Sequence, residues 1–302
     1  MALDTWPILN ALAIGLAAGI AILAALSIIP RTAAIARSLW VTLLTEVVIL
    51  AGAAVPFLVG GLWLKAFLVL LSARVGYECA AVTVKRLPSV PVGRAGHIPL
   101  AVAGISAALS VAAMVVPVGY SVAFASAFVL LAGVLLVSRP RSRHAPVVEA
   151  LIFPGSLLFA FVSVASDAAL APVLLLAFLL VETYDSYALL GGKVWGRSKA
   201  FPNLSPNKTI EGLAFGAGAL ALTTVIAGYL LLGMPPLKAL MVAAVVAVFS
   251  VAGDLAASRL KRAAGVKDYP AVLPRQGGLF DIVDAWLMTG PALAVLALLG
   301  GF

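Results

Sequence analysis

The sequence predicts an all-α, polytopic integral membrane protein, and three observations support this fold class. Hydrophobic residues make up 63% of the 302 residues and charged residues only 11%, which is far from the balance of a soluble domain. Apolar runs long enough to cross a membrane recur along the whole chain. The segments between these runs alternate between rich and poor in Lys and Arg. Together these features predict about ten transmembrane helices, nine at the least.

Each span is expected where roughly 20 apolar residues, enough to cross about 30 Å of hydrocarbon, are bounded by charge, Pro or Gly. The expected spans are residues 8–29, 39–60, 62–83, 98–117, 119–137, 146–165, 168–190, 209–233, 236–257 and 279–300. The first run is too long for the core of a signal peptide, so we interpret it as a retained helix. We divide the chain into N-terminal transmembrane helices (1–145) and a C-terminal transmembrane region (146–302) with cytoplasmic loops 191–208 and 258–278.

The basic residues predict the topology. Of the 20 Lys and Arg residues, only Lys65, Arg74 and Lys238 fall outside the loops that follow spans 1, 3, 5, 7 and 9. Short basic loops stay in the cytoplasm, so both termini are expected on the non-cytoplasmic side of the inner (plasma) membrane. The net charge of +8 then faces anionic lipid at one surface, and membrane lipids rather than nucleic acid are the expected partners. The single cysteine, Cys79, excludes a disulfide framework and a cysteine-based metal site.

The fourth basic loop also carries acidic, glycine, proline and hydroxyl residues. Asp185 lies near the cytoplasmic end of the seventh span, where an unpaired carboxylate is costly to bury. At the start of the eighth span, Ser205 can be an N-cap with Pro206 at the first helical position. The same helix start, beside Lys208 and Thr209, is equally suited to binding a phosphate. Both interpretations stay open.

Three acids are expected to converge on the same membrane boundary. Asp254 lies near the cytoplasmic end of the ninth span, and Asp281 and Asp284 lie one turn apart at the start of the tenth. The helix dipole favours the second pair but does not explain Asp254. A hard cation explains all three, because Mg²⁺ takes one or two carboxylates and completes its shell with water and substrate phosphates. Basic residues can neutralise phosphate charge and glycines allow close backbone approach: Lys261, Arg262, Lys267, Gly277 and Gly278.

These residues resemble the pattern of the phosphatidate cytidylyltransferases, also called CDP-diacylglycerol synthases. The family pattern runs Gly-Asp, Ser-x-x-Lys-Arg, Lys-Asp, Pro-Gly-His-Gly-Gly and Asp-Arg-x-Asp, after an upstream Ser-Pro-x-Lys-Thr-x-Glu-Gly. The matching residues are Gly253, Asp254, Ser258, Lys261, Arg262, Lys267, Asp268, Pro274, Gly277, Gly278, Asp281 and Asp284, with Asp185, Gly192, Gly196, Ser205, Pro206, Lys208, Thr209, Glu211 and Gly212 upstream. The resemblance covers roughly residues 180–290.

The resemblance implies transfer of CMP from CTP to phosphatidate, giving CDP-diacylglycerol and pyrophosphate in phospholipid biosynthesis. It implies Mg²⁺ as cofactor, alone or with a second cation, a homodimer, and an active site at the cytoplasmic membrane face. The implied catalytic residues are Asp254, Lys261, Arg262, Lys267 and Asp281. The implied nucleotide contacts are Ser205, Lys208, Thr209, Ser258, Gly277 and Gly278, and the implied metal ligands are Asp254, Asp281, Asp284 and Asp185.

The chain departs from the family pattern at four positions. Arg275 and Gln276 replace Gly-His, Ile282 replaces the Arg between the two acids, and Ala257 replaces a Glu. Because the acids and basic residues remain, we expect metal and triphosphate binding to be kept and recognition of the acceptor to differ. An inactive relative of the family is a further alternative.

Three other functions also stay open. A CTP-dependent kinase of a lipid alcohol would release CDP, and a cytidylyltransferase acting on a different lipid phosphate would release pyrophosphate. A transporter is the third, because acids such as Glu46, Glu78 and Glu149 lie in or beside apolar segments and such acids often mark ion paths. The sequence shows no inverted repeat to support it.

Overall fold

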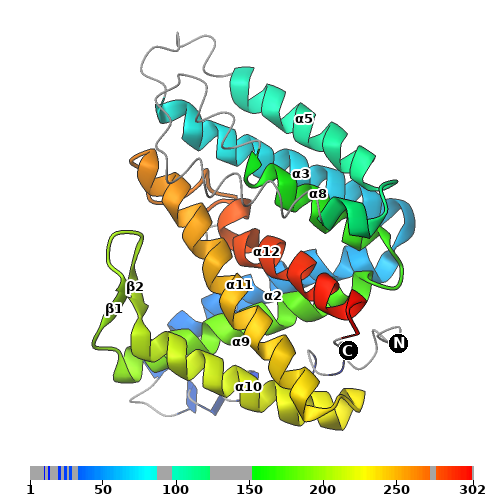
Figure 1. The fold of residues 1–302 in the computed structure, drawn as a ribbon. Helices are drawn as coiled ribbons and strands as arrows, with labels where there is room; N and C mark the ends of the chain where they lie inside the picture. Colours follow the sequence, from blue (N-terminus) through cyan, green and yellow to red (C-terminus); the bar gives the residue numbers. More distant parts are fainter. Residues whose placement is uncertain are drawn as a thin grey trace.

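The computed structural model describes residues 33–86, 97–122, 152–272 and 277–300, with scattered positions before residue 33. The elements in chain order are α2 (Ala33–Val59), α3 (Gly61–Thr83), the 3₁₀ turn η1 (Val84–Arg86), α5 (His97–Ala113), α8 (Gly155–Ser166), α9 (Ala171–Trp195), β1 (Lys199–Phe201), β2 (Ser205–Thr209), α10 (Ile210–Leu232), α11 (Pro236–Ala263) and α12 (Leu279–Leu298). Figure 1 shows that helices dominate the structure. The two strands form a hairpin that connects the end of α9 to the start of α10.

Five helices among the described residues are long and apolar enough to cross a membrane. They are Gly61–Arg86, which includes η1, and α9, α10, α11 and α12. The apolar part of α2 (Leu43–Val59), α5 and α8 are shorter apolar helices that coincide with the expected spans 39–60, 98–117 and 146–165. The expected spans 8–29 and 119–137 lie largely outside the described residues. The helices identify a multi-pass membrane protein, and five of the expected spans have membrane-crossing length.

The β1–β2 hairpin corrects two expectations. The fold is not entirely helical, because Ser205 lies in an antiparallel strand opposite Phe201. Ser205 is therefore not the N-cap of the next helix. Thr209 takes that position, and its hydroxyl accepts the Gly212 N–H at 3.1 Å. Pro206 is compatible with the strand because both strands of a two-stranded sheet are edges.

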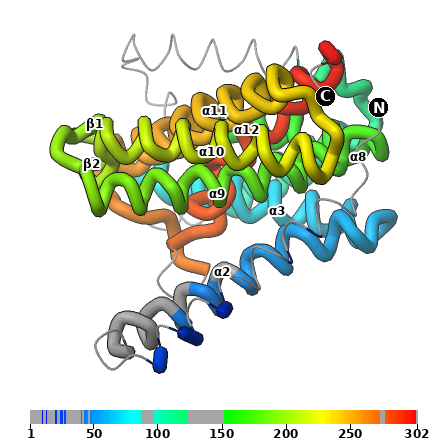
Figure 2. The backbone as a smooth tube through the Cα atoms, turned by 90° about the horizontal axis from the view of Figure 1, so that it is seen from below, coloured from blue at the N-terminus to red at the C-terminus, as the bar shows by residue number. Residues whose placement is uncertain are grey.

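Small residues allow α9 and α10 to lie side by side, as Figure 2 shows. A β-carbon at Gly212 would lie 2.6 Å from the Ala188 carbonyl oxygen, and one at Gly216 would lie 2.9 Å from the Ala188 Cβ. These glycines thus pack two helices of one subunit together. The close contact brings the hairpin up against the last turns of α9.

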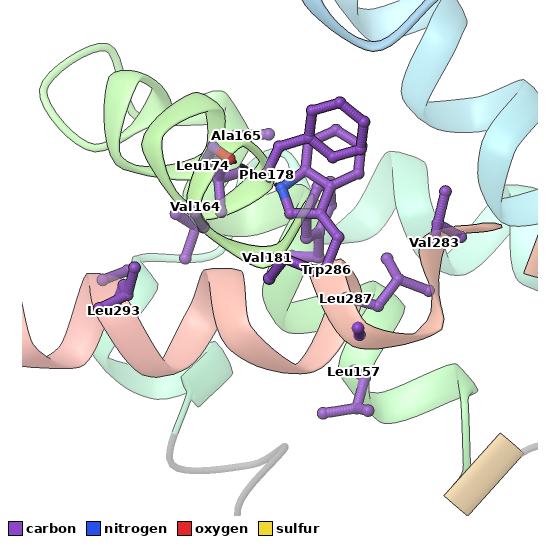
Figure 3. Packing of buried hydrophobic residues seen from close by; sticks show 14 of the residues in the cluster. Leu157, Val164, Ala165, Leu174, Phe178, Val181, Val283, Trp286, Leu287 and Leu293 are labelled. Atoms are coloured by element: carbon purple, nitrogen blue, oxygen red, sulfur yellow. Dashed lines mark hydrogen bonds between the residues drawn. The ribbon is translucent and has the colours of Figure 1, made fainter. Parts of the chain in front are cut away.

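Trp286 anchors α12 in the core of the structure. Its ring centroid lies 4.7 Å from that of Phe178 and 4.8 Å from that of Phe161. Its indole Nε1 donates a hydrogen bond to the Leu174 carbonyl oxygen at 2.7 Å. Figure 3 shows the indole directed from α12 toward Phe178 and Leu174, both in α9. Helix α12 also contacts α3, α8 and α11, so the position of its first turn is set by surrounding helices.

Candidate active site

A pocket of about 630 Å³ lies between α9, the hairpin, α10 and α11. Its lining includes five residues that the sequence singled out: Asp185, Ser205, Lys208, Thr209 and Asp254. Asp185 lies in α9 and Asp254 in α11, whereas the other three residues lie in β2. The hairpin therefore brings the Lys208 ammonium and two hydroxyl groups close to the carboxylates of Asp185 and Asp254.

Lys208 and Asp254 form an ion pair within this pocket. The Lys208 Nζ lies 3.1 Å from the Asp254 Oδ2, and the two side chains are only 21% and 26% exposed. Burial lowers the pKa of Lys208, but the charges of Asp254 and Asp185 outweigh it and raise the pKa above its ordinary value. Lys208 is thus held as an ammonium ion beside two carboxylates.

Asp284 joins this group of charges from α12. The side chain is buried, and its charge interacts with those of Asp254, Lys208 and Lys261. Asp185 interacts in the same way with Asp254 and Lys208. The Asp254 Oδ2 atom is buried and faces the Lys208 Nζ of the ion pair. Asp185 and Asp284 are therefore both electrostatically coupled to an Asp254 carboxylate that already holds Lys208.

Asp281 has different partners. Its Oδ1 lies 2.5 Å from the Lys261 Nζ, and its Oδ2 accepts the backbone N–H groups of Tyr269 and Gly278, both at 2.9 Å. The carboxylate thus ties the segment between α11 and α12 to the start of α12. Across residues 33–86, 97–122, 152–272 and 277–300, no three His, Cys, Asp or Glu side chains form a ready metal site. Of the four acids expected to bind metal, Asp185 and Asp284 each interact electrostatically with Asp254. Asp281 is instead bound to Lys261 and two backbone N–H groups.

The two glycines of the motif are required by packing. Gly277 has a φ of +78°, a conformation that favours glycine, and a β-carbon there would lie 2.6 Å from the Asp281 Oδ2. A β-carbon at Gly278 would lie 2.5 Å from the Glu78 Oε2. Both positions therefore need glycine whether or not a nucleotide is bound.

The remaining expected site residues flank the segment between α11 and α12. Ser258 is buried in α11, and Lys267 is exposed. The Arg262 Nη1 donates to the Val266 carbonyl oxygen at 2.9 Å. Arg275 and Gln276, two of the departures from the family pattern, lie outside the described residues.

Three polar residues outside the expected site also line the pocket: Lys193, Lys199 and Asn207. Glu211 accepts the backbone N–H groups of Arg197 at 3.0 Å and Ser198 at 3.1 Å, and so holds the segment that leads into β1. The position of Glu211 in the first turn of a helix was a signal for a capping role, but its partners could not be read from the sequence.

Comparison with known proteins identifies one matching family and several curated relatives. It matches the cytidylyltransferase family over residues 40–299. It is 32% identical over 164 residues to the phosphatidate cytidylyltransferase of Helicobacter pylori, covering 53% of this chain and 60% of the relative. It is 39% identical over 121 residues to the phosphatidate cytidylyltransferase of Bacillus subtilis, covering 40% and 45%.

An uncharacterized protein of Escherichia coli, YnbB, is 39% identical over 120 residues, covering 39% of this chain and 40% of the relative. The matched regions thus span between about two fifths and three fifths of the length of these relatives. The family match is longer and includes α3, α5, α8 and every element from α9 to α12. The chain therefore belongs to the cytidylyltransferase family.

Proposed function

We propose that this protein transfers CMP from CTP to phosphatidate, producing CDP-diacylglycerol and pyrophosphate for phospholipid synthesis. Family membership and the names of the curated relatives support the reaction class. The observation that carries the proposal is the pocket in which the Lys208–Asp254 pair meets Asp185, with Asp284 interacting electrostatically from α12. This charged pocket adjoins helices of membrane-crossing length, as an enzyme that joins a soluble nucleotide to a lipid requires.

The chemistry needs alignment more than acid–base catalysis. A lipid phosphate monoester has a second pKa of about 6, so it is already an anionic nucleophile at neutral pH. Its oxygen attacks the α-phosphorus of CTP, the bond to the bridging oxygen of the β-phosphate breaks, and pyrophosphate leaves with that electron pair. The protein must hold two anions together in line, which requires positive charge and fixed geometry. Lys208 can supply such charge from within the pocket.

We propose further roles for the flanking residues. Lys261, Arg262 and Lys267 would bind triphosphate and lipid phosphate, and Ser205, Thr209 and Ser258 would donate hydroxyl contacts. Gly277 and Gly278 would let the backbone approach the nucleotide. The support is their place along the hairpin and around the start of α12.

Mg²⁺, alone or with a second cation, is proposed as the cofactor. The chemistry of the donors suits it, because Asp254 contributes a carboxylate to the pocket and its charge interacts with those of two further carboxylates, Asp185 and Asp284. Asp254, Asp185 and Asp284 would hold the cation, which would offset phosphate charge when bound. Asp281 would have to exchange its contact with Lys261 in order to join them.

The membrane arrangement is proposed from the basic loops. The pocket would lie at the cytoplasmic face of the inner membrane and both termini on the other side, because Lys193, Lys199 and Lys208 line the pocket. A homodimer is proposed from the resemblance to the family.

The test is an assay of purified full-length protein with CTP, Mg²⁺ and separate lipid acceptors: phosphatidate, other lipid phosphates and a long-chain lipid alcohol. Pyrophosphate release with a nucleotide-bearing lipid supports the proposal. Release of CDP with a phosphorylated lipid would identify a kinase, and flux into sealed liposomes without CTP would identify a transporter. Reaction with another lipid phosphate but not phosphatidate would keep the chemistry and change the acceptor.

Variants of the acids test the residue roles in the same assay. Asp254→Asn and Asp281→Asn should each abolish CTP-dependent turnover while leaving folded protein in the membrane. Asp167→Asn is the matched control, because Asp167 caps a turn before α9, where its Oδ1 accepts the Ala169 N–H at 2.9 Å. Chelation with EDTA should remove activity and added Mg²⁺ should restore it; full turnover in EDTA would contradict the metal proposal.

A further inference from the structure

The first turn of α12 is capped by a side chain from α3, a distant part of the sequence. Glu78 is fully buried, and its carboxylate accepts the backbone N–H groups of Leu279 at 2.9 Å and Phe280 at 2.8 Å. These residues begin α12, and the first N–H groups of a helix have no acceptor within the helix itself. Gly278 precedes them and has no side chain that could act as a cap. Glu78 therefore supplies the cap across 201 residues of sequence.

Arg74 completes this contact and extends it to the preceding segment. Its Nε donates to the Glu78 Oε1 at 2.6 Å, and its Nη2 donates to the Pro270 carbonyl oxygen at 3.0 Å. An unpaired buried carboxylate would be strongly unfavourable, so Arg74 is needed to keep Glu78 charged in this position. The pair, which we call the Arg74–Glu78 clamp, holds both the start of α12 and the segment that leads into it.

The contacts of Glu78 account for a buried acid that could otherwise mark an ion path. Both of its oxygens are engaged, one by Arg74 and Leu279 and the other by Phe280. A β-carbon at Gly278 would lie only 2.5 Å from the Glu78 Oε2, so the glycine is fitted to this carboxylate. The arrangement has the features of a fixed structural contact rather than a binding site for a moving ion.

The clamp controls where the acidic residues of α12 lie. Asp281 is in the first turn and Asp284 follows it one turn later, so any shift of the helix start moves both. The backbone of Asp284 packs against Gly253, the residue before Asp254, because a β-carbon at Gly253 would lie 2.6 Å from the Asp284 carbonyl oxygen. We propose that Glu78, held by Arg74, is a positioning residue that fixes the start of α12 and so keeps Asp284 beside Asp254. The effect on turnover rests on the function proposed above.

Variants at Glu78 and Arg74 test the turnover effect. Glu78→Gln removes the charge and leaves one acceptor oxygen for two N–H groups, so kcat should fall at least about tenfold while the CTP KM changes less, because small displacements of reacting groups are costly. Arg74→Lys keeps an ammonium for Glu78 but not the second donor to Pro270, so it should retain more activity than Arg74→Gln. Asp167→Asn, in the turn between α8 and α9, should leave kcat unchanged. Wild-type kcat in folded Glu78→Gln protein would overturn the inference while the proposed function stood.

Hydrogen–deuterium exchange gives a readout that needs no activity. Amides in residues 277–284 should exchange faster in Glu78→Gln than in wild type, whereas amides in α9 and α10 should not change. Unchanged exchange at 277–284 would overturn the clamp even if turnover fell. If the wild type makes no nucleotide-bearing lipid, the proposed function fails, and the exchange result still decides whether Glu78 fixes the start of α12.

Discussion

Gly253 in α11 packs directly against the backbone of Asp284 in α12. A β-carbon at position 253 would lie 2.6 Å from the Asp284 carbonyl oxygen and 3.0 Å from the Ala285 Cα. The next residue after the glycine is Asp254, so two acids of the candidate site lie where the backbones of α11 and α12 pack together. The glycine of the Gly-Asp motif is thus explained by helix packing.

Gly253→Ala should therefore reduce activity strongly. The added methyl group meets backbone atoms that cannot move aside, so α11 and α12 must separate and Asp254 must shift relative to Asp284. We expect kcat/KM for CTP to fall at least about tenfold, measured in the nucleotide-lipid assay. Gly218→Ala in α10 is the matched control, because a β-carbon there meets nothing within 4 Å. Equal activity of the two variants would contradict this account.

Lys208 should be essential as a fixed positive charge. Lys208→Met should lower kcat by about 100-fold or more, because it removes a positive charge that faces the substrate phosphates and leaves Asp254 unpaired. Lys208→Arg should retain part of the activity. The measurement is steady-state turnover with CTP varied, and near-normal kcat in Lys208→Met would exclude the proposed contact with phosphate.

The pH dependence of Lys208 has a defined sign. The pKa of Lys208 in the folded protein lies above its ordinary value of 10.5, because Asp254 and Asp185 outweigh the effect of burial. The stabilising ion pair is therefore fully present below pH 10.5 and is lost only as pH rises through the higher folded pKa. Lys208 should therefore stay charged between pH 7 and 9. The pH profiles of turnover for wild type and Lys208→Arg should have the same shape over this range.

Trp286 should be a main contributor to stability. Trp286→Ala removes a buried ring packed on Phe161 and Phe178 and should cost about 3–5 kcal/mol of unfolding free energy. Trp286→Phe keeps most of the packing but loses the hydrogen bond to the Leu174 carbonyl, and should cost about 1–3 kcal/mol. Thermal unfolding in detergent orders the three proteins, and an unchanged Tm for Trp286→Ala would contradict the packing described for α12.

Glu211 should hold the entrance of the hairpin in place. Glu211→Gln leaves one oxygen for the backbone N–H groups of Arg197 and Ser198, so the segment before β1 should open more often. Limited trypsin digestion should cleave faster after Arg197 and Lys199 than in wild type, with little change in Tm. Cleavage at the wild-type rate would show that other contacts hold this segment.

The sequence alone determined that this is a polytopic membrane protein and selected the residues of the candidate site. Hydrophobic composition and helix-length apolar runs are local properties, so the segments that became α3 and α9 to α12 could be identified directly. The residues around Lys208 and Asp254 could be selected because charge at a membrane boundary is costly and needs a reason. The hairpin was missed because a three-residue strand and a five-residue strand carry too little pattern to outweigh the helix-start signal at Ser205.

Only the tertiary structure decided which charged groups face each other. It separated Asp281, which binds Lys261 and two backbone N–H groups, from Asp254, which pairs with Lys208, and from Asp284, whose charge interacts with both. It also assigned Glu78 to the start of α12, a contact across 201 residues. The physical reason is that a carboxylate's partners depend on how helices pack, and packing is set by contacts between segments that are far apart in the chain. Sequence spacing within one helix gives the face on which an acid lies, but not what lies opposite to it.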